Sequence, residues 1–237
     1  MKKIIFATTN ENKVREVRMM MDGLDVELCT MKEAGVDIVK FQTSVTSTSK
    51  FSEKAEYQKR ETGAEETQLE MIKKLRFSFA QHVQLKEYCD RIGIKYLSTP
   101  FDFESIEFLN GLGMDFWKVP SGEIVNIPYL ERIGKTCKPV IMSTGMATMK
   151  EIGYAIDLLR ENGCREIKLL QCTTEYPAAY EHVNLRAMKT LADTFRVEIG
   201  LSDHTRGIEV PIAAVALGAT VIEKHFTLDR NQIGPDH

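Results

Sequence analysis

The stretch VEIGLSDHT, residues 197–205, runs from an apolar segment into the polar side chains of Ser202, Asp203 and His204. An apolar run of this length is typical of a strand in a parallel sheet, where both faces are buried and hydrophobic residues follow one another. The polar residues at its end mark the point where such a strand leaves the core. The same arrangement recurs along the chain, and this recurrence indicates the fold.

Seven further runs resemble this one and alternate with helical patterns. The runs are KKIIFATT (2–9), DIVKFQT (37–43), IKYLSTP (94–100), FWKVPSG (116–122), KPVIMSTG (138–145), IKLLQCT (167–173) and TVIEKHFT (220–227), and helical patterns include residues 66–75, 80–93 and 149–163. Eight strands with helices between them predict an α/β protein with a (β/α)8 TIM-type barrel, while the count alone leaves an open doubly wound sheet as the alternative. In a parallel barrel, the polar strand ends meet at one mouth, where active sites are built.

Composition excludes several classes of function. The chain has 237 residues, of which 43% are hydrophobic, and its 31 basic and 34 acidic residues give a net charge of −3. No long basic run is present, which argues against a nucleic-acid partner. The five cysteines are widely spaced and contain no CxxC pair, so we expect reduced thiols rather than a zinc site or disulfide framework. No apolar stretch approaches the roughly 18 residues of a membrane span, which predicts a cytoplasmic protein without a membrane partner.

Two histidines lie near the ends of adjacent predicted strands. His204 ends the seventh run and His225 lies within the eighth, so both imidazoles can face one divalent metal ion at the mouth. The alternative is that each histidine is a hydrogen-bonded structural residue. His82 falls in a predicted helix and His182 in a loop, and we expect both at the surface.

Two lysines interrupt otherwise apolar strands. Lys40 stands in VKFQT and Lys118 in WKVPSGE, and a lysine is rarely buried without a partner. With the hydroxyls of Thr99, Ser121, Ser143 and Ser202 they predict a pocket for a small phosphorylated or carboxylated anion. The alternative is that either side chain extends to the outer surface.

From about Gly35 to His237, the chain resembles the sialic acid synthase family of phosphoenolpyruvate-condensing enzymes. The resemblance rests on VKFQT, LSTPFD, WKVPSGE, MSTGMAT, CTTEYPA, GLSDHT, ALGATVIEKHFTLDR and GPDH, in this order. It implies a catalytic divalent metal, manganese or magnesium, on His204 and His225. It also implies that Lys40, Thr99, Lys118, Ser121, Ser143, Thr174 and Ser202 surround phosphoenolpyruvate and that Gln42, Tyr176 and Asp236 face the sugar. Glu123 matches a carboxylate that moves protons, with the alternative that it only orients a lysine or ligand.

The reaction implied by this resemblance is a metal-dependent condensation. Phosphoenolpyruvate joins an N-acetylated amino sugar of the N-acetylmannosamine type to give a nonulosonic acid, such as N-acetylneuraminate, and phosphate. Lys40 and Lys118 offset the charge of phosphate and carboxylate throughout. The sequence leaves open which amino sugar is used.

Both ends of the chain depart from the family pattern. Residues 1–34 resemble the start of the inosine/xanthosine triphosphate pyrophosphatases through Thr8, Asn10, Lys13 and Glu16, which predicts a chimeric chain whose first run can still supply barrel strand one. Family members continue with a last helix and a C-terminal antifreeze-like domain, so we expect a truncated barrel over residues 35–237 and a weakened homodimer. Pyrophosphatase activity and a catalytically impaired remnant are the alternative interpretations.

Overall fold

A computed structural model describes residues 2–5, 26–29, 36–45, 52–63, 65, 67–227, 231–232 and 234. Its strands all pair in parallel. They are β1 (Lys2–Ile5), β2 (Val26–Cys29), β3 (Ile38–Thr43), β4 (Lys95–Pro100), β5 (Trp117–Val119), β6 (Val140–Ser143), β7 (Ile167–Cys172), β8 (Glu198–Asp203) and β9 (Ile222–Lys224). The pair β3–β4 and the five-stranded sheet β5–β9 follow chain order, and β4 contacts β5, so β3 to β9 form one row.

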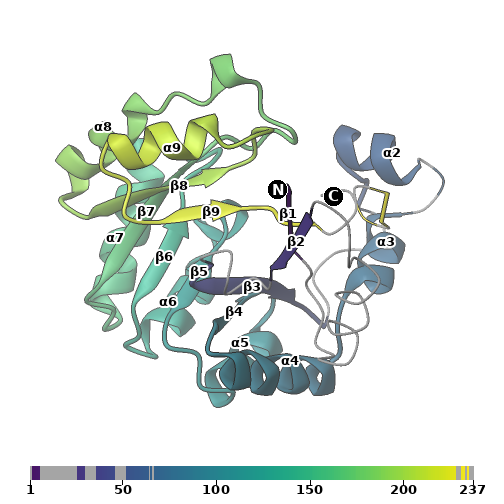
Figure 1. Ribbon diagram of the computed structural model, residues 1–237. Coiled ribbons are helices and arrows are strands. Elements are labelled where there is room, and N and C mark those ends of the chain that lie inside the picture. Colours follow the sequence, from purple (N-terminus) through teal and green to yellow (C-terminus); the bar gives the residue numbers. More distant parts are fainter. Residues whose placement is uncertain are drawn as a thin grey trace.

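Helices connect the strands, and most of them cover the outer side of this row (Figure 1). They are α2 (Glu56–Thr62), α3 (Gln68–Leu75), α4 (Phe79–Ile92), α5 (Phe103–Gly111), α6 (Ile127–Gly134), α7 (Met149–Glu161), α8 (Arg186–Phe195) and α9 (Glu209–Ala216), with short 3-10 turns at Ser121–Glu123 and Tyr180–His182. Local sequence fixes several helix starts. The side chains of Thr67, Ser78 and Thr148 each accept a hydrogen bond from the backbone amide three residues later, and the side chain at that later position accepts one from the backbone amide of the capping residue.

The row of strands curls into a half-barrel. Trp117, Val119, Met142 and Leu169 are fully buried between the sheet and its helices. Although β3 and β9 stand at opposite ends of the row, the ammonium of Lys40 on β3 lies 3.2 Å from a carboxylate oxygen on β9. Opposite ends of a flat sheet of this width cannot meet in this way, so the curvature brings their carboxyl-terminal ends to one mouth.

A glycine allows the last two strands to approach closely. A Cβ atom on Gly200 would lie 2.3 Å from the carbonyl oxygen of Val221 and 2.7 Å from a methyl carbon of Leu170. Any larger residue would push the start of β9 away from β8, where the Leu201 amide donates to the Val221 carbonyl at 2.9 Å and the Thr220 amide donates to the Ile199 carbonyl at 2.8 Å. This close approach places the ends of β8 and β9, with their histidines, side by side.

Most of the predicted organisation is confirmed. Seven of the eight runs form strands of the half-barrel, from β3 to β9. The first run differs: its described part, β1, pairs with β2 in a separate two-stranded sheet instead of extending the row. No helix in the described residues is both long and apolar enough to cross a bilayer. Cys89, Cys137, Cys164 and Cys172 are free thiols.

The prediction that His82 lies at the surface is wrong. His82 is in α4, as expected, but it is fully buried. Its ring nitrogens hydrogen-bond to Tyr96 Oη at 2.8 Å and to Thr43 Oγ1 at 3.1 Å, and burial lowers its pKa below the ordinary value. These two hydroxyls satisfy the ring, which therefore sits in the core without a charge. His182 is exposed, as predicted, and pairs with Glu175 at 2.9 Å.

Candidate active site

A cluster of three charged groups, of which Lys118 is buried, lies at the carboxyl-terminal end of the half-barrel. Lys40 comes from β3, Lys118 from β5 and Glu223 from β9. Glu223 Oε2 lies 3.2 Å from Lys40 Nζ and 3.7 Å from Lys118 Nζ, and its other oxygen accepts a 2.8 Å hydrogen bond from Ser202 Oγ. Neither lysine extends to the outer surface. Both of the predicted lysines therefore point to the same carboxylate, that of Glu223.

Lys118 is the most deeply buried of these cations, with 2% of its surface exposed. Its ammonium donates to Ser143 Oγ at 2.7 Å and to the Val119 carbonyl at 3.1 Å. Burial lowers its pKa to about 8, a shift that Glu223 opposes and Lys40 reinforces. At neutral pH, Lys118 is therefore protonated by only a small margin. A further anion that binds beside it would stabilise the protonated form.

Hydroxyl groups surround the cations. Ser121 Oγ accepts a hydrogen bond from the Gly145 amide at 2.9 Å. A Cβ on Gly145 would lie 2.4 Å from Thr174 Oγ1 and 3.0 Å from Ser121 Oγ, so the absence of a side chain leaves a polar cradle between these residues. Among the described residues, the buried Thr99 hydroxyl has no hydrogen-bond partner. An orphaned hydroxyl of this kind needs an acceptor or donor from a ligand or water.

Two imidazoles stand beside this cluster. The rings of His204 and His225 are 5.4 Å apart between centroids. His204 Nδ1 lies 2.7 Å from the Thr173 carbonyl oxygen, and because a carbonyl can only accept, Nδ1 carries the proton and Nε2 keeps its lone pair. Burial lowers the pKa of His204 below its ordinary value, so the ring is a neutral nitrogen donor of the kind that first-row divalent metals bind.

The donor set suits an ion that keeps open positions. In the part of the chain that the structure describes, no group of three or more histidine, cysteine or carboxylate side chains could hold a metal. The two imidazoles alone would leave the other positions of a bound ion to water and substrate oxygen, and the metal stays a prediction. This is the coordination expected for a Lewis-acid site, and not for a closed structural site.

Backbone pairing and a buried ion pair fix the histidines relative to each other. Asp203 and Lys224, the residues just before them, are opposite one another in the β8–β9 register. Their side chains form an ion pair, and Lys224 Nζ also donates to the Thr205 carbonyl at 2.7 Å. Asp203 is 2% exposed and accepts from Thr205 Oγ1 at 2.8 Å. This pair ties the ends of β8 and β9 immediately below the imidazoles.

Aromatic rings form one wall of the mouth. The Tyr176 ring lies 4.1 Å from the His204 ring and 5.8 Å from the His225 ring, between centroids. On its other side, Tyr57 of α2 stacks on Tyr176 at 4.7 Å with an interplanar angle of 21°. Arg60 of the same helix donates to the Tyr176 carbonyl at 3.3 Å, so α2 is attached to the wall at two points.

The structure brings most of the predicted site residues together, with three exceptions. Glu123 lies at the mouth, but its carboxylate accepts a 2.6 Å hydrogen bond from Asn126 and faces the start of α6. Gln42 is exposed on β3, beside Thr99 in the register. Asp236 lies outside the described residues. The roles predicted for these three residues, like those of the other site residues, stay predictions.

Sequence reasoning missed Glu223, Tyr57 and Cys172. Glu223 interrupts the apolar run TVIEKHFT, which is the same signal that identified Lys40 and Lys118, and it could have been found that way. Cys172 ends β7 within the cluster, where burial raises the pKa of its thiol. Tyr57 gives no such signal, because it lies in a helix far along the chain from the strands it approaches.

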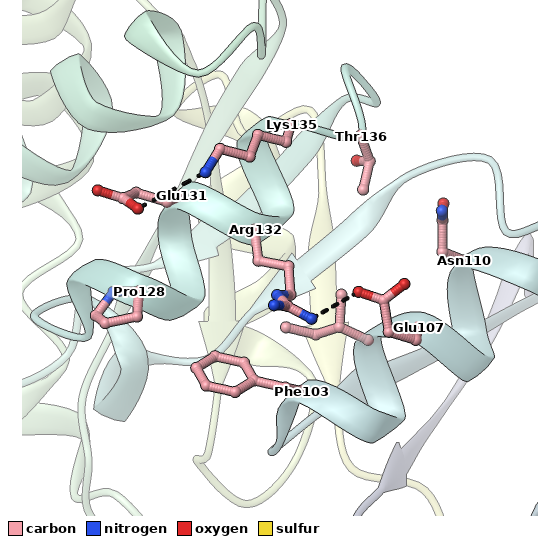
Figure 2. Close-up of a pocket in the computed structure, with 9 residues that line it drawn as sticks. Phe103, Glu107, Asn110, Pro128, Glu131, Arg132, Lys135 and Thr136 are labelled. Carbon is pink, nitrogen blue, oxygen red and sulfur yellow. Dashed lines mark hydrogen bonds and ion pairs between the residues drawn. The ribbon is translucent and has the colours of Figure 1, made fainter.

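A separate hollow of about 490 Å³ lies between α5 and α6, on the outer side of the sheet. Figure 2 shows Arg132 crossing it to Glu107, with an N–O distance of 2.8 Å, and Phe103 beneath the guanidinium. None of the predicted site residues lines it. The hollow is therefore distinct from the mouth of the half-barrel.

Fold and site together define a parallel α/β half-barrel with an anion pocket and an imidazole pair at its mouth. The sequence matches the NeuB family over residues 28–237. The N,N'-diacetyllegionaminic acid synthase of Campylobacter jejuni is 50% identical over 86% of this chain and 63% of its own length. The enzyme of the same name from Legionella pneumophila is 49% identical over 87% of this chain and 60% of its own length. The crystal structure of the N-acetylneuraminic acid synthetase of Leptospira borgpetersenii superposes with a TM-score of 0.74 at 30% identity, covering 97% of this chain and 73% of that one.

The chain belongs to the NeuB family. It spans about 60% of the length of the curated relatives described above. The family match begins at residue 28, within the segment predicted to resemble a pyrophosphatase. The relatives described here are all synthases of sialic-type acids, so the pyrophosphatase resemblance is not borne out.

Proposed function

We propose that this chain carries the catalytic half-barrel of a nonulosonic acid synthase. Phosphoenolpyruvate condenses with the open-chain form of an N-acetylated amino sugar, and water is consumed to give the nonulosonic acid and inorganic phosphate. The observation that supports this most directly is the meeting of Lys40, Lys118, their hydroxyl neighbours and two imidazoles at one mouth. Membership of the NeuB family supports the same reaction class.

The anion pocket suits phosphoenolpyruvate. Its phosphate and carboxylate carry several negative charges, and two ammonium groups in a largely buried site offset them through charge-assisted hydrogen bonds. The unpartnered hydroxyl of Thr99 and the cradle at Gly145 supply further donors on the same side of the mouth. Ser143 and Ser202 already hydrogen-bond Lys118 and Glu223, so they hold the charged groups in place.

His204 and His225 would hold a divalent ion, manganese or magnesium, next to this pocket. When bound, such an ion polarises a carbonyl oxygen without a proton transfer. The chain's own contribution is to keep His204 neutral and correctly oriented through the Thr173 carbonyl. The Asp203–Lys224 pair keeps both strand ends in register.

The sugar would lie against the aromatic wall. Tyr176 stands between the imidazoles and Tyr57, and aromatic faces pack well against the methyl of an acetamido group. Gln42 and Asp236 are the further residues proposed on this side. The sugars compared should include N-acetylmannosamine and its diacetamido relatives, because the two most similar enzymes described above make a diacetyl product.

The proposed reaction forms two bonds at the enolpyruvyl unit, one from carbon 3 to the sugar and one from carbon 2 to a water oxygen, and breaks the bond from carbon 2 to the phosphate oxygen. Carbon 3 of phosphoenolpyruvate attacks the sugar aldehyde carbon, and the aldehyde oxygen takes up a proton. Carbon 2 then gains positive character, water adds there and loses a proton, and the resulting tetrahedral adduct expels phosphate by carbon–oxygen cleavage. Glu123 is the proposed proton carrier for these steps, and binding both reactants at one mouth supplies the proximity.

Phosphate release tests this proposal. We expect release only when phosphoenolpyruvate, an N-acetylated amino sugar and manganese are all present, together with a product whose mass is that of the sugar plus one pyruvic acid. Each single omission is a control, and Lys118→Met tests whether residual release comes from this site. Release from phosphoenolpyruvate without sugar, or no binding of phosphoenolpyruvate by calorimetry, would refute the proposed function.

A further inference from the structure

Glu223 is the partly buried carboxylate at the centre of the anion pocket. Its side chain is 20% exposed. One carboxylate oxygen accepts from Ser202 Oγ at 2.8 Å, and the other faces Lys40 Nζ at 3.2 Å and Lys118 Nζ at 3.7 Å. Both oxygens are therefore engaged, and the carboxylate connects three strands, β3, β5 and β9, through Lys40 and Lys118.

The charges explain why a carboxylate sits in an anion site. Two ammonium groups in a largely buried place repel each other, and burial alone favours the neutral amine. The carboxylate of Glu223 lies between them, 3.2 Å from Lys40 Nζ and 3.7 Å from Lys118 Nζ. It therefore supplies a negative charge between the two ammonium groups while no anion is present.

The geometry of Lys118 shows that this charge also directs it. The ammonium is held by the Ser143 hydroxyl, the Val119 carbonyl and the Glu223 carboxylate. Two hydrogen bonds, to Ser143 and Val119, and an ion pair with Glu223 at 3.7 Å therefore define the position of the ammonium group. The side chain of Lys40 is 30% exposed, so it is the more accessible of the two cations for an incoming ligand.

We propose that Glu223 is a positioning residue of the anion site, which holds the ammonium groups of Lys40 and Lys118 in place and charged before the phosphorylated substrate binds. The inference rests on the proposed function, since it assumes that the site receives phosphoenolpyruvate. Glu223 acts through the lysines and touches no reacting atom. The alternative is that Glu223 competes with the anion for the lysines. Removing the charge of Glu223 would then strengthen phosphoenolpyruvate binding, whereas a positioning role predicts weaker binding.

Glu223→Gln removes the charge and keeps a side chain of similar size that can still bond to Ser202. Glu198→Gln is the matched control, because Glu198 also pairs with a lysine on a neighbouring strand, Lys168 at 2.9 Å, but outside the cluster. Phosphoenolpyruvate affinity is measured by calorimetry at pH 6.5 and 8.5, together with the melting temperature of each variant. We expect Glu223→Gln to weaken binding by about tenfold or more at pH 8.5 and by about threefold or less at pH 6.5, because Lys118 then loses its proton more easily. The control should bind as the parent does at both pH values.

A second measurement does not depend on which anion binds. The titration of Lys118 is followed directly by NMR of labelled lysine, with Lys118→Met to assign its signal. Lys118 is faced by Lys40 from β3, Cys172 from β7 and Glu223 from β9. Among these only Glu223 carries a fixed negative charge, since the pKa of the Cys172 thiol is raised by burial. We expect Lys118 to titrate at lower pH in Glu223→Gln than in the parent.

These two readouts separate the possible failures. If the parent does not bind phosphoenolpyruvate but Lys118 still shifts in the variant, the proposed function fails and the positioning role stands for a different anion. Unchanged titration of Lys118 would overturn the inference even if the parent binds phosphoenolpyruvate. Binding as tight as in the parent, or tighter, at pH 8.5 would also overturn it and would show that Glu223 competes with the anion.

Discussion

The interior of the mouth and its rim are built in different ways. The interior consists of Lys40, Lys118 and Glu223, which stand on three strands and are fixed by hydrogen bonds and ion pairs. The rim consists of Tyr57, Tyr176, His204 and His225, of which Tyr57 comes from a helix, while Tyr176 and both histidines follow the ends of strands. In the proposed function these two regions have different roles: the interior would bind the charged substrate through fixed geometry, and the rim would bind the metal and the sugar.

Removing an imidazole should have the largest effect, and it should be confined to the rim. We expect His204→Ala to weaken manganese binding by about 100-fold or more, because loss of an outer-shell partner alone typically costs 10- to 100-fold. Manganese affinity is measured by calorimetry or electron paramagnetic resonance. His182→Ala is the control, since His182 is exposed and pairs with Glu175 away from the imidazole pair. If His204→Ala binds manganese as tightly as the parent does, the metal does not bind at this site.

Loss of a buried cation should affect the interior by a somewhat smaller factor. We expect Lys118→Met to weaken phosphoenolpyruvate binding by about 10- to 100-fold, the equivalent of one charged hydrogen bond at 1.5–3 kcal/mol. Methionine keeps the apolar stem, so the fold should be retained. Lys168→Met, which removes a strand lysine outside the cluster, should leave affinity unchanged. Manganese binding should survive in both variants, and its loss in Lys118→Met would show that interior and rim are not separable.

The interior was the more predictable region, for a physical reason. A lysine in an apolar strand carries a high cost unless it has a partner, so Lys40 and Lys118 could be identified from the sequence. Their partner Glu223 lies more than 100 positions away along the chain, and only the curvature of the sheet brings it to them. The sequence shows that two lysines interrupt apolar strands, but it does not show that Glu223 pairs with them.

The rim could be predicted only in part. His204 and His225 follow strand ends, and the strand pattern placed them together. Tyr57 depends on how α2 folds back over the mouth, which no local pattern reports. His82 failed in the opposite sense: a polar residue in a helix suggests the surface, but Tyr96 and Thr43 satisfy its ring in the core.

Raising the pH should weaken anion binding in the interior without changing the residues of the rim. Burial sets the pKa of Lys118 at about 8, so its charge is present below this pH and is lost above it. A phosphate monoester is already doubly ionised above pH 7, since its second pKa is about 6. We therefore expect phosphoenolpyruvate affinity to fall by up to about tenfold between pH 7 and 9. The same titration with Lys118→Met should be flat, and a parallel slope in that variant would assign the pH dependence to another group.

The smallest expected effect concerns the aromatic wall, and it decides whether the rim selects the sugar. Tyr57 stacks on Tyr176 at 4.7 Å, and such aromatic pairs contribute about 0.5–1.5 kcal/mol beyond the area they bury. We expect Tyr57→Ala to raise the KM for the amino sugar by about two- to tenfold, with phosphoenolpyruvate and manganese affinities unchanged. Tyr154→Ala, at an exposed tyrosine of α7, is the control. If Tyr57→Ala instead weakens phosphoenolpyruvate binding as strongly as sugar binding, then α2 supports the whole mouth. In that case the interior and the rim do not bind the anion and the sugar separately.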